Sequence, residues 1–166
     1  AIPALLKAAE MSGYDAFYAG VGFALAEIAG RDVSEVAKGL LHKNSSVQFT
    51  SAFALEYMKL DQQSIRVMVQ SLKTLDPNAA TFTSLHEIVG EYLKKHEKIS
   101  APILKRALSS MDAAVRFWAA VALVEIEPGE KRIVSILQEG LRSEKLAWDA
   151  ARALAKLGNR AKPALR

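Results

Sequence analysis

The chain has 166 residues, of which 51% are hydrophobic and 24% are charged, and its formal net charge is +4. This apolar content excludes a disordered chain, and the absence of cysteine excludes disulfide frameworks, cysteine-based zinc sites and cysteine nucleophiles. No apolar run reaches the roughly 18 residues that a membrane-spanning helix needs, so we expect no membrane span and place residues 1–166 in a single domain.

One pattern recurs along the chain and predicts repeated helices. An aliphatic residue is followed by an aromatic residue two positions later, then by small residues and a closing leucine or isoleucine. The closing residues are Leu25, Leu55, Ile88, Leu123 and Leu154, with the copy at Ile88 the most divergent. They lie about 30 to 35 residues apart, and a period of this length indicates a repeat architecture.

Each period contains two predicted helices, which we call A and B. The A helices carry the repeated pattern and are predicted over residues 14–31, 45–60, 78–97, 112–129 and 144–159. The B helices follow a short turn and place apolar residues at helical spacing around residues 65–72, 103–108 and 133–141. No alternation typical of strands competes with this pattern, so the sequence predicts an all-α fold.

Residues that begin and end helices fall between these elements. Helix starts are predicted at Asp32 with Glu35, at Ser45 with Gln48, and at Asp76 before Pro77. Gly30 and Gly158 follow predicted A helices, at positions where a left-handed residue often ends a helix.

The A-helix pattern is similar to the HEAT repeat family, and in particular to short bacterial HEAT-like repeats. The residues that carry the resemblance are Val115-Arg116, Ala119-Ala120-Val121-Ala122-Leu123 and the segment from Ala150 to Leu165. The resemblance implies an α-solenoid, a right-handed superhelix of about five helix pairs with A helices on the convex side and B helices on the concave side. It implies protein binding or scaffolding rather than catalysis.

Basic residues recur on the predicted solvent face of the B helices. We call this set the basic row: Arg66, Lys73, Lys98, Lys105, Lys131 and Arg142. The simpler interpretation is an ordinary solvated face. Our hypothesis is that the row lines a concave groove that binds a protein or an acidic peptide.

Nucleic-acid binding is the alternative function, as in the HEAT-like DNA-repair glycosylases. The net charge of +4 is modest, and the predicted B helices contain no aromatic residue on which bases could stack. All aromatic residues lie in predicted A helices. We expect them to fill the layer between A helices, and the other interpretation is that some line a convex docking groove.

His86-Glu87 is the one dipeptide that suggests a metal. HEAT-like deoxyhypusine hydroxylases hold two irons through His-Glu dipeptides on four repeats, whereas this sequence contains one such dipeptide. In our alignment His86 corresponds to Val121, and the pair of that family would correspond to Phe117-Trp118. One histidine and one glutamate cannot build a di-iron site, so we expect no catalytic residue, no metal and no cofactor.

The leading segment, residues 2–11, has the apolar spacing of a B helix without a preceding A helix. It contains Ile2, Leu5, Leu6 and Met11, whereas terminal repeats usually carry a polar outer face. We therefore expect the chain to be a module of a longer polypeptide.

Overall fold

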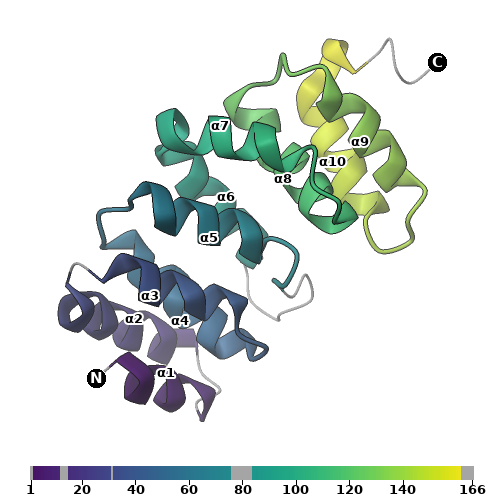
Figure 1. Cartoon of the computed structure of the whole chain (residues 1–166). Helices are drawn as coiled ribbons and strands as arrows, with labels where there is room; N and C mark the ends of the chain where they lie inside the picture. Colours follow the sequence, from purple (N-terminus) through teal and green to yellow (C-terminus); the bar gives the residue numbers. More distant parts are fainter. Residues whose placement is uncertain (1, 12–14, 31, 76–83, 162–166) are drawn as a thin grey trace. The chain divides into compact units, whose positions relative to one another are not determined.

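The computed structural model describes residues 2–11, 15–30, 32–75 and 84–161, apart from the side chains of residues 15–19 (Figure 1). Within these ranges the chain forms ten α-helices and two short 3-10 helices and contains no strand, which confirms the all-α class. The helices are α1 (Ile2–Glu10), α2 (Asp15–Ala29), α3 (Val33–Lys38), η1 (Gly39–Leu41), α4 (Ser45–Glu56), α5 (Gln62–Ser71), α6 (Leu85–Lys95), α7 (Glu97–Ala107), α8 (Ala113–Ile126), α9 (Arg132–Leu141), α10 (Ala147–Leu157) and η2 (Gly158–Arg160).

The predicted helices correspond to observed ones. The A helices are α2, α4, α6, α8 and α10, and the B helices are α1, α3 with η1, α5, α7 and α9. The predicted start at Asp76-Pro77 lies outside the described residues. None of the described helices is long and apolar enough to cross a lipid bilayer.

The chain divides into two compact units, Ala1–Tyr92 and Leu93–Arg166, and the division falls within α6. In the first unit α4 is central, because it packs against α1, α2, α3 and η1. In the second unit α8 is central and packs against α7, α9 and α10. The single domain over residues 1–166 stays a prediction.

Burial follows the repeated pattern in both units. Leu25 and Leu55 are buried in the first unit, and Leu123 and Leu154 are buried in the second. At Ile88, the divergent copy, the side chain is only half-buried. Burying these side chains stabilises a helix pair by roughly 1.5–3 kcal/mol each, which explains why the pattern recurs at every A helix.

The start of α4 differs from the predicted capping box. Asn44, not Ser45, is the N-cap, and its Oδ1 accepts hydrogen bonds from the backbone N–H groups of Ser46 and Val47. Gln48 is buried, with its Nε2 donating to the carbonyls of His42 and Thr74. Gln48 therefore joins the loop before α4 to the turn after α5, although its polar chemistry would assign it to the exposed face of α4.

Other helix ends confirm the predictions in part. Asp32 precedes α3 but its side chain makes no capping hydrogen bond, so that predicted capping box is wrong. Gly30 and Gly158 have φ angles of 57° and 54°, which confirms the left-handed positions after α2 and α10. A reciprocal capping box that we did not predict joins Asp61 and Ser64 at the start of α5.

Candidate functional site

The first unit carries two members of the basic row. Arg66 is exposed on α5, and Lys73 is exposed in the turn that follows this helix. The remaining four belong to the second unit, so a surface that joins all six residues stays a prediction.

The second unit carries four members of the basic row on two helices. Lys98 and Lys105 lie on α7, while Lys131 and Arg142 are the N-cap and C-cap residues of α9. Lys98, Lys131 and Arg142 are exposed, and none of them forms a hydrogen bond or ion pair through its side chain with another residue in the described ranges. These three cations are therefore available to an external anion.

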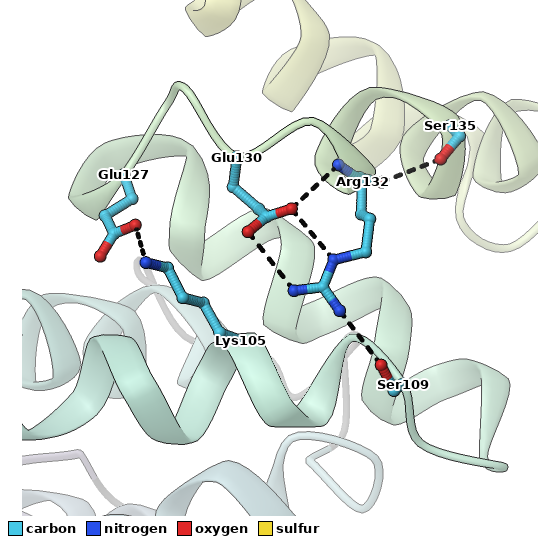
Figure 2. A network of polar contacts seen from close by, with 6 residues as sticks. All are labelled: Lys105, Ser109, Glu127, Glu130, Arg132 and Ser135. Atoms are coloured by element: carbon cyan, nitrogen blue, oxygen red, sulfur yellow. Dashed lines mark hydrogen bonds and ion pairs between the residues drawn. The ribbon is translucent and has the colours of Figure 1, made fainter.

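Lys105 differs from these three because a glutamate neutralises it. Its Nζ lies 2.5 Å from Oε2 of Glu127, the residue that ends α8 (Figure 2). Both side chains are about 40% exposed. The structure thus divides the basic row of this unit into three available cations and one that is already paired.

A second glutamate of the same loop pairs with a cation outside the predicted row. Glu130 accepts three hydrogen bonds from Arg132: at Oε1 from the backbone N–H (3.2 Å) and from Nε (3.0 Å), and at Oε2 from Nη2 (3.3 Å). The hydrogen bonds from the Arg132 side chain and backbone lower the pKa of Glu130, so it stays ionised at neutral pH. Arg132 Nη1 also donates to Ser109 Oγ (3.1 Å), which links the start of α9 to the end of α7 (Figure 2).

Charges on the A helices of the second unit pair with one another. Glu125 of α8 accepts from Lys94 of α6 at 2.7 Å and from Lys156 of α10, and each lysine is 31 residues from Glu125 along the chain. Donation by Lys156 and then by Lys94 lowers the pKa of Glu125 to about 2. We call Lys94, Glu125 and Lys156 the charge ladder. It was not predicted, although a basic, an acidic and a basic residue follow one another at intervals of 31 residues in the sequence.

Glu125→Gln should lower the free energy of unfolding at neutral pH by up to about 1 kcal/mol, since its lysine partners are about half exposed. The folded-state pKa is depressed from 4.5 to about 2, so this contribution is present above pH 4.5 and is lost as the pH falls toward 2. Urea unfolding followed by circular dichroism checks this. Glu91→Gln, an exposed change on α6, is the matched control. A difference between wild type and Glu125→Gln that is as large at pH 2 as at pH 7 would contradict the assignment.

The closing position expected at Ile88 is less buried than its neighbours on α6. Ile88 is half-buried, whereas Val89, Tyr92 and Leu93 are buried. The alignment of the divergent repeat stays a prediction.

His86-Glu87 is the dipeptide that suggested a metal, and it lies at the start of α6. His86 is buried, and its Nε2 donates to the carbonyl of Leu72 at 2.9 Å. No group of three or more His, Asp or Glu side chains in the described ranges could hold a metal ion.

The aromatic side chains are not all in the core. Phe117 and Trp118 are buried and meet edge to face, with ring centroids 5.1 Å apart. Phe23 and Tyr57 form a similar pair at 5.4 Å but are half exposed, and Trp148 on α10 is 77% exposed. The exposed members do not meet the expectation that aromatic residues fill the layer between A helices. Phe117 does not meet it either, because it packs against Gly140 of the B helix α9.

No protein-family model matches the chain, and no curated protein or solved structure is significantly similar to it.

Proposed function

We propose that the chain is an array of HEAT-like helix pairs, wound as a right-handed superhelix, that acts as a non-catalytic scaffold and binds an acidic peptide or protein segment through its B helices. Within each unit, helices two apart in the chain pack together: α2 with α4 and α3 with α5 in the first, and α8 with α10 in the second. Such packing of A on A and B on B supports a repeat array, in which stacked pairs bury a continuous core. The charge ladder from Lys94 to Lys156 supports the same interpretation.

The exposed cations of the B helices carry the proposal. On the A helices of the second unit, Lys94 and Lys156 are neutralised by Glu125. On its B helices, Lys98, Lys131 and Arg142 are exposed and have no anionic partner within the described ranges. Lys105 and Arg132 of the B helices are also paired, with Glu127 and Glu130, so the proposal depends on the three unpaired cations. Their exposure without an anionic partner among the described residues favours the B helices as the surface for an acidic partner.

The expected interaction is electrostatic and shared among several residues. One exposed ion pair contributes under about 1 kcal/mol, so a single cation would not hold a partner. Lys131 and Arg142 lie at opposite ends of α9, roughly 16 Å apart at the rise of an α-helix, so an extended segment would contact them at separate points. At low salt their fields reach far enough to add, and their combined field raises the rate of association about tenfold or more. A protein segment with several carboxylates fits such a surface.

The triple variant Lys98→Glu, Lys131→Glu, Arg142→Glu tests the proposal. Fluorescence anisotropy with a labelled glutamate-rich peptide should show about tenfold weaker binding than wild type at about 0.05 M salt, and a much smaller difference at about 0.5 M salt. Circular dichroism melts should coincide, because all three side chains are exposed.

The matched control is Lys43→Glu, Lys59→Glu, Lys145→Glu, which reverses three exposed cations that lie outside the B helices. If the control loses as much affinity as the test variant, net charge alone governs binding and the proposed surface is wrong. Labelled duplex DNA is the second ligand. Tighter binding to DNA than to the peptide at equal salt, with the same loss in the test variant, would overturn the acidic partner in favour of nucleic acid.

A further inference from the structure

The connection between α8 and α9 places two carboxylates against cations of the B-helix side. Glu127 and Glu130 flank the turn Pro128-Gly129. In Figure 2 both side chains leave this loop and reach basic side chains, Glu127 toward Lys105 of α7 and Glu130 toward Arg132 of α9. The loop thus supplies acidic groups to the same kind of surface that an acidic partner would contact.

The two pairs differ in how firmly they are held. Glu130 accepts three hydrogen bonds from Arg132, and its side chain is only 17% exposed. Glu127 makes a single contact with Lys105, and its side chain is 37% exposed. A carboxylate held by one partly solvated contact exchanges with a competing carboxylate more readily than one held by three.

We propose that Glu127 is an internal competitor for the acidic partner: it occupies Lys105 in the unbound chain, and a carboxylate of the partner displaces it. This inference rests on the proposed function and adds a residue that limits the affinity of the chain for the acidic partner. Glu130 and Arg132 stay paired, so Arg132 does not contribute to binding. The contact surface of the second unit in the complex is therefore Lys98, Lys105, Lys131 and Arg142.

Glu127→Gln tests the competition, because it removes the charge and keeps the size of the side chain. Affinity for the labelled glutamate-rich peptide at low salt should rise about two- to fivefold, the range expected for loss of one exposed ion pair. Glu139→Gln is the matched control, since Glu139 is exposed on α9 and forms no ion pair in the described ranges. This control changes the net charge by the same amount as Glu127→Gln and should raise the affinity for the peptide less than that variant does.

The substitution Lys105→Gln, made alone and together with Glu127→Gln, completes a double-mutant cycle. In the wild-type background it should lower affinity, because the complex loses its contact with Lys105 and Glu127 is left as an unpaired carboxylate. In the Glu127→Gln background it should remove the gain. Circular dichroism melts of each variant establish that the fold is retained.

The possible outcomes separate this inference from the proposed function. Equal gains from Glu127→Gln and Glu139→Gln, or a gain that survives Lys105→Gln, would overturn the competition while leaving the basic surface intact. Absence of binding by wild type and every variant at low salt would overturn the proposed function, and this inference with it.

Discussion

Gly140→Ala should lower the free energy of unfolding by about 1–3 kcal/mol, through overpacking between α8 and α9. A Cβ atom at Gly140 would lie 2.4 Å from Cε2 of Phe117 and 3.2 Å from Cβ of Ala150. The Phe117 ring is 2% exposed, so it has little room to move away. The better helix propensity of alanine, at most about 1 kcal/mol, offsets only part of this cost.

Tryptophan fluorescence during urea unfolding measures this effect in the right part of the chain, because Trp118 and Trp148 both lie in the second unit. Gly129→Ala is the control: no heavy atom lies within 4 Å of its Cβ position, and the change expected is under about 0.5 kcal/mol. In a Phe117→Leu background, Gly140→Ala should cost less than in wild type, since leucine lacks the Cε2 atom that makes the closest contact. A stabilised Gly140→Ala protein would contradict this account of the contact.

The fold class and the positions of most helices could be predicted because apolar spacing reports the helical period directly. The alignment of the divergent repeat could not. Tyr92 lies four residues after Ile88, about one helical turn, and a shift of one turn leaves the apolar stripe on the same face. The sequence pattern is therefore nearly insensitive to this shift, and the alignment of this repeat stays a prediction.

Helix starts show a similar limit. Asn44 and Ser45 are both favoured N-cap residues and are adjacent in the sequence. The sequence pattern therefore does not show which of their side chains accepts hydrogen bonds from the first turn of the helix. Gln48 was assigned to a polar face by its chemistry, but its burial depends on the carbonyls of His42 and Thr74, which the fold brings to it. Long-range partners of this kind leave no periodic signal.

The basic row could be predicted as a set of exposed cations, but not its division into available and paired members. Helical spacing places Lys98 and Lys105 on one helix, whereas the pairing of Lys105 depends on the direction in which the α8–α9 connection carries Glu127. Arg132 was missed for the same reason, since its partner Glu130 belongs to this connection. The closeness of Glu130 and Arg132 in the sequence is a signal that could have indicated their pair, whereas no local signal indicates the pairing of Glu127 with Lys105.

Gly39→Ala should destabilise the first unit by about 1–3 kcal/mol, because η1 and α4 approach closely at this residue. A Cβ atom there would lie 1.9 Å from Oγ and 3.0 Å from Cβ of Ser51, and Ser51 is fully buried. Gly20→Ala on α2 is the control, since no heavy atom lies within 4 Å of its Cβ position. It should stabilise the chain by up to about 1 kcal/mol through helix propensity.

Ser51→Ala separates the clash from the loss of a polar group. Ser51 Oγ is buried and has no hydrogen-bond partner among the described residues, and an unsatisfied buried hydroxyl costs about 1–3 kcal/mol. Ser51→Ala alone should therefore leave stability unchanged or raise it, as measured by urea unfolding followed by far-ultraviolet circular dichroism. In this background Gly39→Ala should cost less than in wild type, because the 1.9 Å contact disappears while the 3.0 Å contact with Cβ persists. Equal costs in the two backgrounds would mean that the Ser51 hydroxyl does not set the spacing between η1 and α4.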